Sequence, residues 1–371
     1  MRKAAVICEF NPFHNGHKFL LEKIKQEYAD SIVCIMSGNF VQRGDIAITD
    51  KYARTQAALE HGADMVAELP TVYAAAPAHV FADNGARLAK ALGCEMLCFG
   101  TEDPLTNLKR VSDACRSPQT QQRVAEEMKA GSYYPKALSD ALGGQDAQII
   151  KKPNNILALE YLTACERYGL TPIAIPRMGV GHDDTQVAGE YASASRIREL
   201  ICGGEAYDRY TPMVIEKPAV LSTLEPVILF KLKTMDKDEI AQLPGVGEGL
   251  ENRIYEVAIR YHSLEEITEQ IKTKRYTHAR LRRILVCSLL DITKRLQEMP
   301  VPYARILGFR RDSADLLQSS ELPLIIDVKR GYEELHYSSK EISNIDLKAA
   351  EAMNIARKTS LNEFSHGVIK L

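Results

Sequence analysis

Short apolar runs alternate with amphipathic helical patterns over the first half of the chain. The runs that predict strands are AAVICEF from residue 4, SIVCIMSG from 31, ADMVAELP from 63, EMLCFGTE from 95 and TPIAIPR from 171. The stretches between them, such as 17–28 and 154–168, place apolar residues at the spacing of one helix face. This alternation favours a Rossmann-like α/β fold, in which helices cover both faces of a parallel sheet.

Ligands of such sheets bind beyond the carboxyl ends of the strands. The strand ends that we expect to share this rim are Phe10, Gly38, Gly100 and Arg177.

The pattern changes near residue 204 and becomes mostly helical. The helical stretches are 239–261, 263–274 and 277–298, and two prolines follow the last of them. A mixed segment with a strand-like run, LPLIIDV, closes the chain. We therefore expect three parts. They are an α/β domain over 1–203, a helical domain over 204–300 and a mixed C-terminal tail over 301–371 that packs on the rest.

The composition excludes several classes of protein. No apolar run approaches the roughly 18 residues of a membrane span, and the basic N-terminus leads into a run too short for a signal peptide. Eight scattered cysteines lie mostly inside apolar runs, which is typical of reduced structural thiols and not of a metal site. The net charge of -2 points to no partner by itself. A cytoplasmic protein without a membrane partner is expected.

A turn with the sequence NPFHNGH joins the first predicted strand to the first predicted helix. A helix N-terminus attracts phosphate through its unpaired N–H groups and its positive dipole end. Gly16 permits close approach of a ligand. His14 and His17, three residues apart, can both donate hydrogen bonds to one phosphate group. The alternative is an ordinary turn, but the position between strand and helix favours a nucleotide phosphate site.

This turn resembles the HxGH signature of the nucleotidylyltransferase superfamily, which shares its fold with class I aminoacyl-tRNA synthetases. The stretch SASRIRELI, with Ser193, Ser195, Ile197 and Arg198, is similar to the second signature of that superfamily. The pair of signatures implies attack on the α-phosphate of ATP with release of pyrophosphate.

Five longer blocks narrow the resemblance to the bacterial tRNA(Met) cytidine acetate ligase family. They are CEFNPFHNGH, MSGNFVQRGDIAI, KYARTQAALEHGADMVAELP, KPNNILALEY and TKRYTHARLRRIL, and they span about residues 7–290. The resemblance implies an ATP-dependent ligase that activates acetate as acetyl-adenylate. The acetyl group then passes to N4 of the anticodon wobble cytidine of elongator tRNA(Met), forming N4-acetylcytidine. Mg²⁺ is expected to enter with the ATP phosphates, without a metal site of the protein.

The resemblance also implies the residues of the site, with His14 and His17 as the catalytic pair. The residues implied to bind ATP are Ile7, Cys8, Glu9, Phe10, Asn11, Pro12, Phe13, His14, Asn15, Gly16, His17, Lys18, Phe19, Leu20, Gly100, Asn154, Arg177 and Ser195. Asn155 is the alternative to Asn154, because either can cap the helix after Pro153. The loop GNFVQRGD is interpreted as a flap near the acyl site, where Arg43 can hold a carboxylate or a phosphate.

A strongly basic segment lies in the helical half. From Lys272 to Arg311 the chain has eleven Lys and Arg residues against two acidic residues, a pattern typical of nucleic-acid binding. The residues predicted to face solvent and bind tRNA are Lys272, Lys274, Arg275, Arg280, Arg282 and Arg283. The turn PGVG is either a helix-hairpin-helix phosphate site or a tight interhelical turn. The resemblance and this charge together imply that 1–203 is the ATP-binding catalytic domain and 204–300 a basic tRNA-binding domain. Because these parts are separate along the chain, adenylation is expected to proceed without tRNA, and no DNA partner is expected.

Two other functions remain open from the sequence alone. A small-molecule adenylyltransferase of coenzyme biosynthesis would use the histidine turn but would give the basic helices no role. A non-enzymatic RNA-binding protein would have no need for intact His14, Gly16 and His17.

Overall fold

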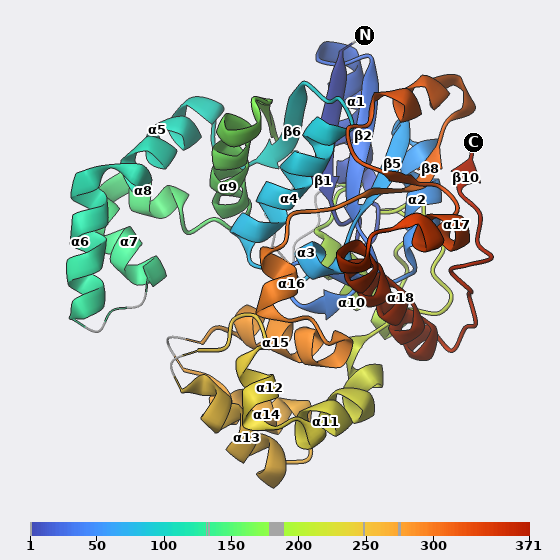
Figure 1. The fold of residues 1–371 in the computed structure, drawn as a ribbon. Coiled ribbons are helices and arrows are strands. Elements are labelled where there is room, and N and C mark those ends of the chain that lie inside the picture. Colours follow the sequence, from blue (N-terminus) through green and yellow to red (C-terminus); the bar gives the residue numbers. More distant parts are fainter. Residues whose placement is uncertain (1, 131, 133, 178–188, 248, 274–275) are drawn as a thin grey trace.

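The computed structural model describes residues 2–130, 132, 134–177, 189–247, 249–273 and 276–371. Its centre is a mostly parallel sheet with the strand order β10-β8-β5-β2-β1-β6-β7. The five parallel strands of the first half are β1 (Lys3–Cys8), β2 (Ser31–Ser37), β5 (Met65–Leu69), β6 (Met96–Thr101) and β7 (Thr171–Pro176). The five predicted strands and the Rossmann-like fold are therefore confirmed (Figure 1).

The far edge of the sheet differs from the prediction, because the C-terminal segment supplies it. Strand β8 (Ala304–Phe309) pairs antiparallel with β5, so the sheet is mixed and not wholly parallel. Strands β9 (Leu324–Ile325) and β10 (Ile369–Lys370) both pair parallel with β8. Residues 301–371 thus complete the central sheet and do not merely pack on it.

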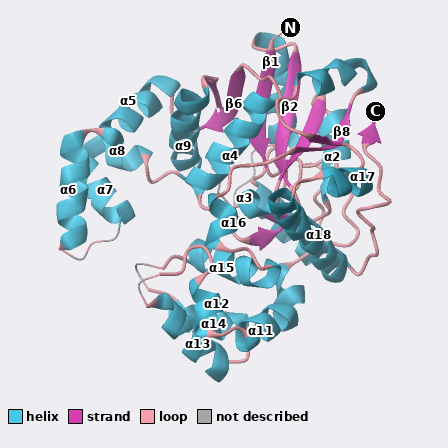
Figure 2. Ribbon diagram, viewed as in Figure 1, coloured by secondary structure: helices cyan, strands magenta, loops and turns pink. Residues whose placement is uncertain are grey.

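Helices cover both faces of the sheet (Figure 2). On one face α1 (Asn15–Glu27), α2 (Lys51–Glu60) and α10 (Ala194–Gly203) enclose one apolar core. On the other face α4 (Ala78–Ala91) and α9 (Pro153–Tyr168) pack on β1, β2, β6 and β7 and form a second, larger core. Polar side chains cap α2 and α10 as the sequence indicates, since Asp50 accepts from two N–H groups of α2 and Ser193 from one of α10.

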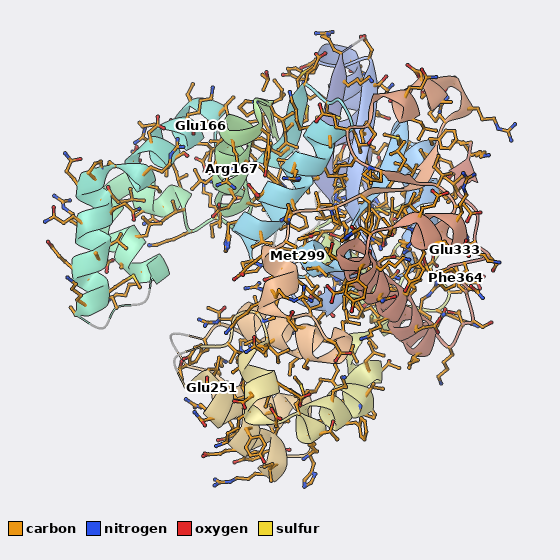
Figure 3. All side chains as sticks on the ribbon, viewed as in Figure 1. Glu166, Arg167, Glu251, Met299, Glu333 and Phe364 are labelled. Atoms are coloured by element: carbon orange, nitrogen blue, oxygen red, sulfur yellow. The ribbon has the colours of Figure 1, made fainter. Side chains whose placement is uncertain are left out.

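Two groups of helices extend from this layered body (Figure 1). The first group follows β6 and contains α5 (Leu105–Arg116), α6 (Pro118–Lys129), α7 (Tyr134–Leu142) and α8 (Gly144–Ile149). The second, here called the helical lobe (residues 221–298), contains η1 (Leu221–Leu224), α11 (Glu225–Thr234), α12 (Lys237–Ala241), α13 (Leu250–Arg260), α14 (Leu264–Ile271), α15 (His278–Leu290) and α16 (Lys294–Glu298). Met299 marks the point where the chain leaves this lobe for β8 (Figure 3).

Several predicted elements are shorter than the sequence pattern indicates. The stretch 239–261 is divided between α12 and α13, and 277–298 is divided at Asp291, whose positive φ of 58° ends α15. The loop after β2 is a hairpin of β3 (Phe40–Val41) and β4 (Asp45–Ile46). The run LPLIIDV yields only β9. The remaining helices are α3 (Thr71–Ala74) between β5 and α4, η2 (Arg311–Ser319) between β8 and β9, and α17 (Val328–Glu334) and α18 (Tyr337–Arg357) after β9.

All eight cysteines are free thiols. Within the described ranges, no helix combines the length and the apolar character that crossing a membrane requires, and no group of three or more His, Cys, Asp or Glu side chains is arranged to hold a metal ion.

Candidate functional site

The carboxyl ends of the parallel strands open into a cavity of about 620 Å³, a size that suits a nucleotide. Its walls come from the turn after β1, the β3–β4 hairpin, α4, α9, α10 and the first turns of α15. The predicted site residues that line it are Ile7, Cys8, Glu9, Phe10, Asn11, His14, Gly16, His17, Phe19, Leu20, Gly100, Asn154, Arg177 and Ser195. Of the four strand ends predicted to share one rim, only Gly38 is not among the lining residues.

The two histidines of the turn are held in fixed orientations at the start of α1. His14 is the N-cap, and its Nδ1 accepts from the backbone N–H of Gly16 at 3.1 Å. The backbone N–H of His14 donates to Nδ1 of His17 at 3.2 Å, and the two rings stack with centroids 3.7 Å apart. Because both Nδ1 atoms accept hydrogen bonds, each neutral ring carries its proton on Nε2. Each histidine therefore offers an N–H donor, as stabilisation of a charged phosphate requires.

Four predicted residues of the turn do not line the cavity, and two of them hold its shape. They are Pro12, Phe13, Asn15 and Lys18. Phe13 is fully buried and packs its ring 5.7 Å from that of His17. The side-chain amide of Asn15 donates to the carbonyls of Glu190 and Arg209, at 2.9 and 3.0 Å. The turn is thus tied to the segment around α10.

A buried arginine that the sequence did not single out fastens the ends of β1 and β2. The guanidinium of Arg54 donates to the carbonyls of Glu9, at 2.6 Å, and Ser37, at 3.0 Å, and also to that of Gly38. Burial lowers the pKa of Arg54 to about 10, which leaves it charged at neutral pH. The backbone on both sides of the cavity mouth is therefore fixed by one side chain of α2.

The Gly100 side of the cavity distinguishes the two candidate asparagines. Asn154 lines the cavity, donates to Glu102 at 2.6 Å and accepts from Arg177 at 3.4 Å. Asn155 is fully buried, and its amide donates to Asp103 at 2.6 Å. A side chain at Gly100 would have its Cβ only 3.3 Å from Cγ of Arg177. This wall is otherwise apolar and aromatic, with Phe81, Phe99, Leu157 and Tyr161.

The hairpin end of the cavity is rich in charge. The charged residues that line it are Glu9, Arg43, Asp45, Arg198, Arg282 and Arg283. Arg198 donates to the carbonyl of Asn11 at 2.8 Å and to Oγ of Ser195 at 3.2 Å. Burial lowers the pKa of Arg198, and the nearby carboxylates of Glu9 and Asp45 offset this lowering only in part. Four arginines against two carboxylates give this end a positive potential that favours anionic groups.

The structure places two of the α15 arginines beside the nucleotide cavity. They were expected to face solvent: Arg282 is exposed, Arg283 is half-buried, and both line the same cavity as the histidines. Arg283 donates to the carbonyl of Gln42 at 3.4 Å, and Arg282 lies 3.8 Å from the carboxylate of Asp45. Gly44, with a φ of 74°, packs directly on the backbone of this helix, where any side chain would clash. The helical lobe is therefore in contact with the hairpin of the cavity.

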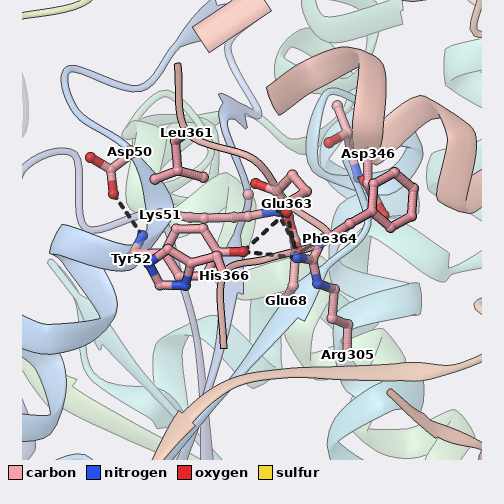
Figure 4. A network of polar contacts seen from close by, with 12 residues as sticks. Asp50, Lys51, Tyr52, Glu68, Arg305, Asp346, Leu361, Glu363, Phe364 and His366 are labelled. Atoms are coloured by element: carbon pink, nitrogen blue, oxygen red, sulfur yellow. Dashed lines mark hydrogen bonds and ion pairs between the residues drawn. The ribbon is translucent and has the colours of Figure 1, made fainter. Parts of the chain in front are cut away.

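The basic segment is also less uniform than its sequence indicates. Arg305 is buried in β8, where it pairs with Glu68 at 3.1 Å and with Glu363 (Figure 4). Arg295 pairs with Glu341, and Arg280 donates to the carbonyl of Gly245 in the PGVG turn. Lys272 is exposed and lies 3.3 Å from Glu269. Lys274 and Arg275 lie outside the described residues.

Comparison with known proteins identifies the family. The HIGH Nucleotidyl Transferase family model matches residues 1–366. A tRNA(Met) cytidine acetate ligase of Thermoanaerobacter sp. (strain X514) is 35% identical over 400 residues, covering 99% of both chains. One of Acetivibrio thermocellus is 36% identical over 365 residues and 88% of both chains. The chain belongs to the HIGH nucleotidyl transferase family, with the tRNA(Met) cytidine acetate ligases.

Solved structures share the whole architecture of this chain. Thermotoga maritima TmcAL, in an apo crystal form, has a TM-score of 0.90 and 27% identity over 100% of both chains. The same protein bound with alpha-thio ATP gives the same TM-score, identity and coverage. The likeness to this protein therefore includes the helical lobe and the C-terminal strands as well as the sheet.

Proposed function

We propose that this protein is an ATP-dependent ligase that joins acetate to a cytidine of elongator tRNA(Met). The observation that carries the proposal is the histidine turn, which presents two oriented N–H donors to a nucleotide-sized cavity that arginines of the helical lobe also reach. Family membership and the names of the relatives support the same reaction. We expect the protein to act in the cytoplasm, where its tRNA and ATP are found.

In the first step, an acetate oxygen attacks the α-phosphorus of ATP, and pyrophosphate leaves to give acetyl-adenylate. The N–H donors of His14 and His17 and the N-terminus of α1 stabilise the negative charge that grows on the phosphate oxygens. In the second step, the N4 amine of the anticodon wobble cytidine attacks the acetyl carbon, and AMP leaves. The product is N4-acetylcytidine.

We assign the adenosine to the apolar wall with Gly100, Asn154 and Arg177, and the phosphates to the turn between Ile7 and Leu20 with Ser195. Mg²⁺ is proposed to enter with ATP, because this ion is usually held by substrate phosphates together with one or two carboxylates.

The helical lobe is proposed to hold the tRNA, and residues 1–203 with the C-terminal strands to bind ATP. Arg282 and Arg283 lie on α15 and line the nucleotide cavity, so we propose that they contact both the nucleotide and an RNA bound on this helix. The predicted RNA contacts of Lys272, Lys274, Arg275 and Arg280 stay part of this proposal.

The decisive experiment incubates the protein with ATP, radiolabelled acetate and total bacterial tRNA. Label should appear in acetylated cytidine after digestion of the RNA to nucleosides. Label confined to a small adenylated product would favour a small-molecule adenylyltransferase instead. Binding of tRNA without any labelled product would favour a non-enzymatic RNA-binding protein.

The basic residues should bind tRNA through counterion release. Replacing Lys272 and Arg282 together with glutamine should flatten the slope of log affinity against log salt by about 0.7–0.9 for each phosphate that the variant no longer neutralises. Filter binding of tRNA at a series of salt concentrations measures that slope. Arg330→Gln, on exposed α17, is the matched control and should leave it unchanged. An unchanged slope in the double variant would contradict the assignment.

A further inference from the structure

The proposed acetyl transfer needs a group that accepts a proton. The exocyclic amine of cytidine must lose one proton when it forms an amide, and a positioned base in the site is the usual means. The two histidines do not suit this task. Their Nδ1 atoms already accept backbone hydrogen bonds, so Nε2 carries the proton in each neutral ring.

Glu9 and Asp45 are the two acidic side chains that line the cavity within the described part of the chain. Asp45 is engaged through both oxygens, since Oδ1 accepts from the N–H of Ile46 at 2.9 Å and Oδ2 lies 3.8 Å from Arg282. Glu9 accepts one hydrogen bond, from the N–H of Gln42 to Oε1 at 2.8 Å. Its Oε2 makes no hydrogen bond or ion pair with any other described residue.

The position of Glu9 suits a meeting point of nucleotide and RNA base. Its backbone carbonyl is fixed by Arg54, and it directly follows β1, ahead of the histidine turn. Its carboxylate binds the hairpin residue Gln42, whose carbonyl accepts from Arg283 of the helical lobe. Glu9 therefore lies between the proposed phosphate site and the lobe from which tRNA would approach.

We propose that Glu9 is the proton acceptor of the acetyl-transfer step, an inference that rests on the function proposed above. The bond between N4 and the acetyl carbon forms, and the bond from that carbon to the phosphate oxygen breaks with its electron pair leaving on AMP. The proton of N4 passes to Oε2 of Glu9. This role is distinct from the charge stabilisation by the histidines in the first step.

The surroundings of Glu9 make its carboxylate a stronger base than that of an ordinary glutamate. Burial raises the pKa of Glu9. The hydrogen bond from Gln42 and the charges of three arginines oppose this rise only in part. The titratable and charged groups that face Glu9 are Cys8 of β1, Arg43 of the hairpin, Arg54 of α2, Tyr161 of α9 and Arg198 of α10. A carboxylate with a raised pKa binds a proton more readily than an ordinary one.

The test measures acetyl transfer alone, in a single turnover of the full-length protein with added acetyl-adenylate and tRNA. Glu9→Gln should transfer acetyl about 10²–10⁴-fold more slowly than the wild type. The wild-type rate should rise with pH up to the pKa of Glu9 and then level off. The Gln variant should lose this rise, and Glu9→Asp, which retains a carboxylate, should retain it.

Asp45→Asn is the control, because it removes the other carboxylate of the cavity and should keep the pH profile. A Gln variant that transfers acetyl within about threefold of the wild type, or that keeps the pH-dependent rise, would overturn the assignment. Thermal melting of each variant separates loss of the base from loss of the fold. If wild-type protein forms neither labelled acetyl-adenylate nor labelled tRNA, the proposed function itself falls, and this inference falls with it.

Discussion

Replacing His17 with alanine should lower the rate of acetate-dependent ATP–pyrophosphate exchange by about 10²–10³. The substitution removes an N–H donor that is held at the first turn of α1 by the backbone of His14 and faces the cavity. Such a donor stabilises charge that develops only in the transition state, so the rate should fall more than the affinity for ATP. Exchange of labelled pyrophosphate into ATP measures the first step without tRNA.

His79→Ala is a suitable control, because this histidine is exposed on α4 and does not line the cavity. It should exchange at the wild-type rate. An equally fast His17→Ala variant would remove His17 from the catalytic pair. A requirement for tRNA in the wild-type exchange would show that RNA completes the site, acting through the contacts of Arg282 and Arg283 with the hairpin.

The histidine turn was predictable because its signals are local. Strand, turn and helix follow one another within 25 residues, and the spacing of His14, Gly16 and His17 is written in the sequence. The five parallel strands were predictable for the same reason, since each buried strand is a short continuous apolar run.

Contacts between distant segments could not be predicted in this way. Arg305 looks like one more basic residue of an RNA-binding segment, yet it is buried against carboxylates of β5 and of the C-terminal segment. The contact of Arg283 with Gln42 joins residues that are 241 positions apart. Sequence spacing gives the charge of such residues but not the partners that tertiary folding brings to them.

The choice between Asn154 and Asn155 stayed open in the sequence for a different reason. Both lie in the first turn of α9, where either side chain is an acceptable polar residue. They differ only in direction, because Asn154 faces the cavity while Asn155 is buried against Asp103. Which of these two adjacent residues faces the cavity depends on how the helix packs on the sheet. The amphipathic pattern of this helix is too weak to indicate that orientation.

The buried ion cluster that holds β8 should contribute strongly to stability. It consists of Lys51, Glu68, Arg305 and Glu363, all at most 5% exposed (Figure 4). Lys51 lies 2.9 Å from Glu68 and 3.0 Å from Glu363, and Tyr52 donates to Glu363 at 3.1 Å. Removing one partner of a buried ion pair leaves an uncompensated charge away from water.

Glu68→Gln should therefore lower the free energy of unfolding by about 3–5 kcal/mol. The amide keeps the size of the side chain but leaves Lys51 and Arg305 to share one carboxylate. Urea titration followed by circular dichroism measures the change. Glu334→Gln removes the partner of Arg330 in an exposed pair and should cost less than about 1 kcal/mol.

Acid should weaken the same cluster in the wild-type protein. Lys51 and Arg305 lower the pKa of Glu363 from 4.5 to about 2, so the folded state binds this proton less readily than the unfolded state. The contribution of Glu363 to stability is fully present above pH 4.5 and is lost as the pH falls toward 2. Urea titrations of wild type and Glu363→Gln across this range should converge at low pH, because the variant lacks the group that titrates. A stability difference that stays constant down to about pH 2 would show that the carboxylate of Glu363 does not stabilise the cluster through its charge.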